Sequence, residues 1–246
     1  MHDRAVLITG AARRIGAAIA RRLHASGCRV VLHCHRSRGD ADRLADALNA
    51  DRGDSCAVLQ CDLLDRDQLE RLVEDAAAAF GRLDALVNNA SSFYPTPLGR
   101  IEASDWDELI GSNLRAPLFL SQAAATHLRA ARGAIVNLVD IHSERPLKDF
   151  VVYSVAKAAL AGLTRSLALE LGPEVRVNGV SPGAILWPDG DEHFAPSERQ
   201  RILEQTPLKR IGSPEDVAGA VKYLLLDAPF VSGQIIAVDG GRGIHL

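Results

Sequence analysis

Short runs of consecutive apolar residues alternate with longer amphipathic stretches along the whole chain. The apolar runs predict seven strands, at 5–9, 28–34, 56–61, 83–89, 133–139, 174–180 and 234–239. The amphipathic stretches predict helices near 13–26, 40–50, 66–80, 104–130, 153–171 and 214–226. Most of the strand runs are apolar throughout rather than at alternate positions, which is typical of a parallel sheet covered on both faces.

The strands and helices alternate without a Pro-, Gly- or Ser-rich linker, so we expect a single α/β domain over residues 1–246. Its predicted architecture is a Rossmann-type, doubly wound parallel sheet of about seven strands with helices on both faces. Ser213 followed by Pro214 predicts a helix start, and Gly172 followed by Pro173 predicts a helix end. Residues 184–205 contain few apolar side chains and are predicted to form a lid or an irregular loop.

Composition narrows the class of protein. The 246 residues are 47% hydrophobic and 24% charged, with a formal net charge of −3. Basic residues are scattered, which argues against nucleic-acid binding, and no apolar run is long enough to cross a membrane. The chain enters its first strand without room for a signal peptide, and its four cysteines show neither a CxxC pair nor metal-ligand spacing. We therefore expect a cytoplasmic protein with reduced thiols and no metal site.

The first predicted strand runs into the segment TGAARRIGAAIA, residues 9–20. Gly10 and Gly16 bracket a turn into a helix, where free backbone N–H groups and the helix dipole favour a phosphate. Ala18 occupies the place of a third glycine and is small enough for close packing of the helix on the strand. Such turns also occur for packing alone, but the position in a β–α–β unit favours a dinucleotide site.

The end of the second predicted strand indicates which dinucleotide is bound. An NAD site has an acidic residue there, whereas this chain has HCHRSRGD with Arg36 and Arg38. Arg13 and Arg14 lie in the facing turn, and guanidinium groups suit a 2′-phosphate. The alternative is a solvated basic loop. The pattern favours NADP(H).

Tyr153 and Lys157 open a predicted helix in the segment YSVAK. Their spacing of four places both side chains on one face of the helix. An ammonium group beside a phenol favours the phenolate, so we expect the tyrosine pKa to be lowered. The pair is then suited to proton transfer.

The chain resembles the short-chain dehydrogenase/reductases over essentially its whole length. The resemblance is carried by TGAARRIG (9–16), NNA (88–90), Asn113, YSVAK (153–157) and SPG (181–183), in the family's order and spacing. It implies that Tyr153 is the proton donor and that Lys157 holds the nicotinamide ribose and lowers the tyrosine pKa. It further implies that Asn113 supports a water relay.

One position departs from the family pattern. Thirteen residues before the tyrosine, where the family has a serine, this chain has Asp140. A carboxylate fits poorly beside a developing alkoxide but well beside a substrate that offers N–H donors. It could orient such a substrate or, with a raised pKa, donate a proton to it. The alternative is that Asp140 caps the end of a strand.

Within the family the chain is most similar to the pteridine reductases. Four segments carry this similarity: TGAARRIG with Arg14, HCHRS (33–37), NNASSFYPTPL (88–98) and NLVD (137–140). The resemblance implies that Phe93 stacks on a pterin whose other face is covered by nicotinamide. The implied substrate-binding residues are Arg14, Ser91, Phe93, Asp140 and Tyr153, to which the lid residue Trp187 is added as a substrate contact. Phe93 as a core residue is the alternative.

The cofactor site follows from the same resemblance. Arg36 and Ser37, with His35 nearby and Arg13 across the turn, are expected to hold the 2′-phosphate, and Asp62 and Leu63 to lie along adenine. The full predicted set is Gly10, Arg13, Arg14, Ile15, Gly16, His35, Arg36, Ser37, Asp62, Leu63, Asn89, Ala90, Ser91, Tyr153, Lys157, Pro182 and Gly183. The family is usually a homotetramer, so a homotetramer is expected here.

These patterns together predict an NADPH-dependent reductase of dihydropterins, with Asp140, Tyr153, Lys157 and Asn113 as its catalytic residues. Dihydrobiopterin, dihydromonapterin, dihydrofolate and oxidised pterins are the candidate substrates. One alternative is a reductase of ketones such as 3-oxoacyl thioesters, against which Asp140 and Phe93 argue. The other is a non-catalytic NADP(H)-binding sensor, against which the intact Asn113, Tyr153 and Lys157 argue.

Overall fold

The computed structural model describes residues 3–187 and 195–244 and contains one sheet of seven parallel strands. Their order across the sheet is β3-β2-β1-β4-β5-β6-β7, so the chain winds outward from β1 in one direction and then from β4 in the other. The strands are Ala5–Ile8 (β1), Arg29–Cys34 (β2), Cys56–Gln60 (β3), Ala85–Asn88 (β4), Ala134–Leu138 (β5), Arg176–Pro182 (β6) and Ile235–Val238 (β7). This is the doubly wound Rossmann-type architecture that the sequence predicts.

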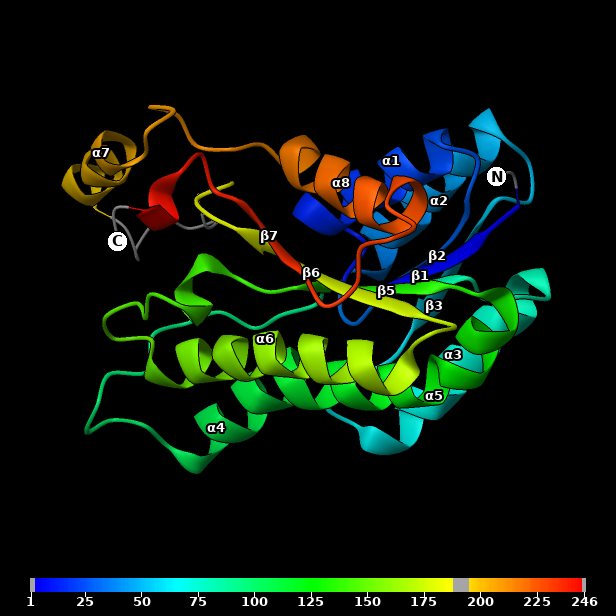
Figure 1. The fold of residues 1–246 in the computed structure, drawn as a ribbon, viewed down its shortest axis with the longest axis horizontal. Coiled ribbons are helices and arrows are strands. Elements are labelled where there is room, and N and C mark those ends of the chain that lie inside the picture. The colour runs from blue at the N-terminus through cyan, green and yellow to red at the C-terminus, as the bar shows by residue number, and fades with distance from the viewer. Residues whose placement is uncertain (1–2, 188–194, 245–246) are drawn as a thin grey trace.

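Helices cover both faces of the sheet (Figure 1). On one face lie α1 (Arg14–Ala25), α2 (Arg38–Asp51) and α8 (Pro214–Lys222), and on the other lie α3 (Arg66–Phe80), α4 (Ala103–Ile110), α5 (Ala116–Ala131) and α6 (Val151–Leu171). Helix α7 (Pro196–Gln205) stands apart from both layers, beside the C-terminal segment.

The two-sided covering explains why most strand positions are apolar on both faces of the sheet. In β1, Val6 and Ile8 join the core beneath α1 and α8, whereas Leu7 joins the core beneath α3 and α5. The same alternation holds in β5, where Val136 lies on the first side and Ile135 on the second. Successive side chains of a strand point to opposite faces, so a strand covered on both faces favours apolar residues at consecutive positions.

Helix ends follow the predicted signals. Ser213 accepts a hydrogen bond from the backbone N–H of Asp216, and the Asp216 carboxylate accepts one from the backbone N–H of Ser213. This capping box starts α8, with Pro214 at its first position. Helix α6 ends at Leu171, directly before Gly172 and Pro173.

Two details differ from the sequence-based expectation. The helix expected at 104–130 is divided by a π-helical turn, Gly111–Arg115, between α4 and α5. The predicted lid at 184–205 is not irregular throughout, because α7 occupies its second half; it buries Ile202 and otherwise presents polar residues, so its hydrophobic signal is weak. Residues 188–194, with His193 and Phe194, lie outside the described part of the chain.

Candidate active site

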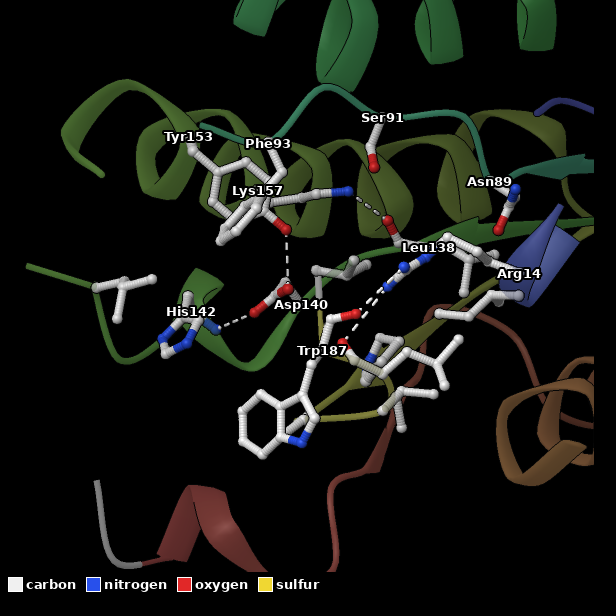
Figure 2. A pocket seen from close by; sticks show the side chains of 18 of the residues that line it. Arg14, Asn89, Ser91, Phe93, Leu138, Asp140, His142, Tyr153, Lys157 and Trp187 are labelled. Atoms are coloured by element: carbon white, nitrogen blue, oxygen red, sulfur yellow. Dashed lines mark hydrogen bonds between the residues drawn. The ribbon is translucent and has the colours of Figure 1, made fainter. Parts of the chain in front are cut away.

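The carboxyl ends of the central strands open into a cavity of about 640 Å³. Open α/β sheets bind ligands at this edge, where the strand order reverses. Figure 2 shows α6 and the segment after β4 on one side of the cavity and Trp187 with the C-terminal segment on the other. The predicted site residues that line it are Gly10, Arg13, Arg14, Ile15, Gly16, Asn89, Ala90, Ser91, Phe93, Asp140, Tyr153, Lys157, Pro182, Gly183 and Trp187.

The glycine turn after β1 has no room for larger side chains. A Cβ at Gly16 would lie 2.2 Å from the carbonyl oxygen of Gly10 and 2.7 Å from Nδ2 of Asn89. Gly10 has a φ of +62°, and a Cβ there would lie 3.0 Å from Cα of Ala90. Asn89 closes the turn by donating through Nδ2 to the carbonyl oxygens of Thr9 and Gly10, at 2.8 and 3.0 Å. The result is a close approach of two loops at the N-terminus of α1, a geometry that suits a phosphate.

Asp140, Tyr153 and Lys157 meet in the middle of the cavity (Figure 2). The Tyr153 hydroxyl donates to Oδ2 of Asp140 at 2.8 Å. Lys157 is buried and its Nζ donates to the carbonyl oxygen of Leu138, the last residue of β5, at 2.8 Å. Oδ1 of Asp140 accepts the backbone N–H of His142 at 2.8 Å. Asp140 therefore caps a 3₁₀ turn after β5 with one oxygen, as the alternative interpretation expects, and binds the tyrosine with the other.

The pKa of Tyr153 beside Lys157 differs from the sequence-based expectation. The pKa of Tyr153 is raised well above its ordinary value, first by burial and then by the Asp140 carboxylate. Burial lowers the pKa of Lys157 to about 8, although Asp140 acts in the opposite direction. The expectation of a lowered tyrosine pKa is therefore wrong for this structure, because helical spacing alone does not reveal burial or the carboxylate.

Asn113 does not line the cavity and lies in the π-helical turn between α4 and α5. Its Nδ2 donates to the carbonyl oxygens of Ser92 and Leu109, at 3.0 and 2.9 Å. Its Oδ1 is buried and has no hydrogen-bond partner among residues 3–187 and 195–244. π-Helical turns recur at functional sites, and this one leaves an acceptor ready for water.

Phe93 lies half-buried between the cavity and a small apolar cluster. Its ring stacks on Phe150 with centroids 4.6 Å apart and meets the Tyr153 ring edge-on at 4.8 Å. Phe93 therefore packs against apolar neighbours, as the alternative interpretation expects, while it also lines the cavity. A backbone bridge between Thr96 and Phe150 brings the loop against the start of α6 and gives Phe93 these neighbours.

Of the residues predicted to hold the 2′-phosphate and adenine, only Arg13 lines the cavity. His35, Arg36, Ser37, Asp62 and Leu63 follow β2 and β3, at the same edge of the sheet. The Arg13 guanidinium pairs with Asp40 of α2. His35 Nε2 lies 3.8 Å from a carboxylate oxygen of Asp62, and Leu63 is buried.

Several cavity residues were not predicted from the sequence. Leu138 contributes the carbonyl oxygen that binds Lys157. In the sequence, only its position at the end of β5 could have indicated this role. Leu186 was also not predicted. Its carbonyl oxygen and that of Trp187 accept hydrogen bonds from Arg14, at 3.4 and 3.3 Å, which connect the glycine turn to the lid. The remaining unpredicted lining residues are Val139, His142, Leu147, Ala184, Ile185, Glu198, Arg201, Ile202 and Arg242. Within the described ranges there is no cluster of His, Cys, Asp or Glu that could hold a metal ion.

Known proteins resemble this chain over almost its full length. The family model described as Enoyl-(Acyl carrier protein) reductase matches residues 10–242. Pteridine reductase 1 of Leishmania tarentolae is 41% identical, with 97% of this chain and 96% of that protein covered. The granaticin polyketide synthase putative ketoacyl reductase 2 of Streptomyces violaceoruber is 37% identical, with 96% and 94% covered. The 3-oxoacyl-[acyl-carrier-protein] reductase of Synechocystis sp. is 35% identical, with 96% and 95% covered. On the family match, these relatives and the Rossmann-type sheet, the chain belongs to the short-chain dehydrogenase/reductase family of oxidoreductases.

Proposed function

We propose that the chain is an NADPH-dependent reductase of dihydropterins. The observation that carries the proposal is the 2.8 Å hydrogen bond between the Tyr153 hydroxyl and the Asp140 carboxylate inside the cavity. Reduction of a ketone would build an alkoxide beside this carboxylate, and two negative charges would repel each other there. A pterin instead presents N–H donors around its rim, which the carboxylate can accept.

The residues of the cavity fit the proposed cofactor. The crowded turn at Gly10 and Gly16 leads into the N-terminus of α1, which suits the pyrophosphate. Lys157, whose Nζ donates to the Leu138 carbonyl oxygen, would hold the nicotinamide ribose. Arg36 and Ser37 would bind the 2′-phosphate. When bound, NADPH supplies the hydride.

The proton chemistry falls to this chain's own side chains. Tyr153 would give its hydroxyl proton to N5 of the pterin as C6 is reduced, and its raised pKa keeps that proton in place until the substrate is bound. Asp140 would orient the ring, and Phe93 would stack on it. The unpartnered Oδ1 of Asn113 would hold a water that helps to return the proton.

The similar proteins support two candidate substrates. The relative named pteridine reductase 1 favours the pterin, whereas the relatives named ketoacyl or 3-oxoacyl reductases favour a ketone. The two kinds of relative are similarly identical to this chain, at 41% against 37% and 35%, so a ketoacyl substrate is retained as the second candidate. Asp140 beside the proton donor favours the pterin.

NADPH oxidation with dihydrobiopterin, dihydromonapterin and dihydrofolate, and with a panel of 3-oxoacyl substrates, tests the proposal. We expect turnover of at least one pterin, and losses of kcat/KM of about tenfold or more in both Asp140→Ser and Phe93→Ala. Near-normal kcat/KM in both variants, or turnover of the ketones alone, would exclude a pterin reductase. NADPH binding without any turnover would favour the sensor.

We also propose a cytoplasmic homotetramer. Cys28, Cys34, Cys56 and Cys61 are all free thiols, which suits a reducing compartment. Val155 and Leu169 of α6 are exposed, at 48% and 81%, and such residues are suited to contact another subunit. No helix within the described ranges is long and apolar enough to cross a membrane. Light scattering of the purified protein tests the tetramer, and a monomer at all concentrations would exclude it.

A further inference from the structure

Arg242 is a buried arginine that lines the cavity from the C-terminal end of the fold. It begins the short helix Arg242–Ile244 after β7, and only 7% of its surface is exposed. Its Nε has no hydrogen-bond partner among residues 3–187 and 195–244. Arginine is almost never fully buried unless it is paired, because its charge loses the stabilisation of water. The described part of the chain supplies no such partner for this nitrogen.

The backbone that carries Arg242 is firmly held. Oδ1 and Oδ2 of Asp239 accept the backbone N–H groups of Gly241 and Gly243, at 2.8 and 2.6 Å. Gly241 has a φ of +84°, and a Cβ there would lie 2.9 Å from Cγ of Pro207. The side chain of Arg242 therefore projects from a fixed turn, which is what a recognition residue requires.

The acidic side chains around Arg242 are already engaged. Arg242 interacts electrostatically with four charged groups. Three are the carboxylates of Asp140, Glu198 and Asp239, and the fourth is the Arg201 guanidinium, which repels it. Both oxygens of Asp140 accept hydrogen bonds within the site, and both oxygens of Asp239 hold the turn. Glu198 lies 3.4 Å from the Arg201 guanidinium. Among the residues that the structure describes, the charge of Arg242 is thus not matched by a carboxylate of its own.

We propose that Arg242 binds an anionic oxygen group of the substrate, such as a carboxylate. A planar guanidinium can bind a carboxylate with two parallel hydrogen bonds, and the excluded water strengthens the contact. The C-terminal segment lies on the Trp187 side of the cavity, away from Phe93 and Tyr153 (Figure 2). The anionic group therefore belongs to a part of the substrate other than the ring that meets the proton donor. This inference rests on the proposed function, because it takes a pterin as the ring bound at Tyr153.

Dihydrofolate and its dimethyl ester test the inference, since they share a pterin and differ in negative charge. We expect wild-type protein to favour the acid over the ester in kcat/KM by at least about tenfold. Arg242→Gln should bring this acid-to-ester ratio close to one, a drop of about tenfold or more, mainly through KM, because the contact is present before the reaction begins. Arg242→Lys keeps the charge and should lower the ratio less. As a control, Arg210→Gln removes an arginine that does not line the cavity and whose side chain is 58% exposed, and should change the ratio less than about threefold.

A wild-type ratio near one, or a ratio unchanged in Arg242→Gln, would overturn the role of Arg242, even where both pterins are reduced. If neither pterin is reduced, the proposed function fails, and Arg242 is judged by binding alone. In that case the dissociation constants of acetoacetate and methyl acetoacetate are measured in the presence of NADP⁺. Tighter binding of the acid that is lost in Arg242→Gln supports the anion site, and equal or undetectable binding of the two overturns it.

Discussion

The Tyr153 hydroxyl donates a hydrogen bond to Asp140 across 2.8 Å, and the carboxylate helps to keep the phenol protonated. Asp140→Asn retains the size of the side chain and removes its charge. We expect the pKa of Tyr153 to fall in this variant, because the Asp140 carboxylate, the second cause of its raised value after burial, disappears.

The chain has three tyrosines, so tyrosinate absorbance can follow this change. In the wild type the Tyr153 step should lie at the alkaline end of the titration, and in Asp140→Asn it should move to lower pH. Tyr153→Phe, which removes the step, identifies it. Superimposable titrations of the wild type and Asp140→Asn would show that the carboxylate does not control the phenol.

The Lys157 ammonium sets a second pH dependence. Its pKa is lowered to about 8 by burial, so the cation is present below pH 8 and is lost as the pH rises through this value. Since the proposed ribose contact needs the cation, kcat/KM should fall about tenfold per pH unit above pH 8. Lys157→Met should lose about 100-fold or more at pH 7 and show no decline near pH 8. A wild-type profile that stays flat to pH 9.5 would contradict this role.

Cofactor preference should depend on Arg36. Arg13 pairs with Asp40 and Arg38 with Asp42, whereas no ion pair within the described ranges involves Arg36. Arg36→Ala should therefore raise KM for NADPH by about 10- to 100-fold, because a charge-assisted contact with the 2′-phosphate is lost. KM for NADH, which lacks that phosphate, should change less than about threefold.

Arg38→Ala is the matched control for Arg36→Ala and should leave the NADPH/NADH preference close to that of the wild type. Equal effects of Arg36→Ala on the two cofactors would argue against a 2′-phosphate site at the end of β2. The same result in both variants would indicate a general effect of positive charge rather than a specific contact.

Local signals in the sequence predicted the sheet and most of its helices. Strands such as β1 and β7 are continuous apolar runs, and the caps at Ser213 and Gly172 are determined by neighbouring residues. Helix α7 was missed because it buries only Ile202 and is otherwise polar. The π-helical turn at Asn113 was missed because a single such turn does not visibly change the hydrophobic periodicity of a long helical stretch.

The candidate site was predictable in its residues but not in its electrostatics. Tyr153, Lys157 and Asp140 follow from spacing and resemblance, and the structure brings them together. The direction of the tyrosine pKa shift depends on burial and on a residue from another element, neither of which is visible in a helical repeat. Arg242 was missed for the same kind of reason, since only the turn after β7 brings it to the cavity.

The neutral imidazole of His33 links the glycine turn after β1 to the sheet. Its Nδ1 accepts the backbone N–H of Gly10 at 3.2 Å, so its Nε2–H donates to the Cys61 carbonyl oxygen at 3.2 Å. Burial lowers the pKa of His33 to about 4. The unfolded chain, with an ordinary pKa near 6.5, binds more protons between pH 4 and 6.5. The free energy of unfolding should therefore fall as the pH drops through this window, with His33 accounting for up to about 3 kcal/mol of the loss.

His33→Leu removes this titration, so its free energy of unfolding should depend less on pH between 6.5 and 4 than that of the wild type. Urea unfolding at pH 7, 5.5 and 4.5 measures the slopes. His24 also has a lowered pKa, but it is present in both proteins, so the difference between the two slopes reports His33. The matched control His127→Gln, on α5 beside Glu74, should keep the wild-type slope. If His33→Leu keeps that slope as well, the Gly10 contact does not require a neutral ring. A flatter slope would show that protonation of His33 weakens its contact with Gly10, in the turn that would hold the pyrophosphate. NADPH binding should then weaken over the same pH window.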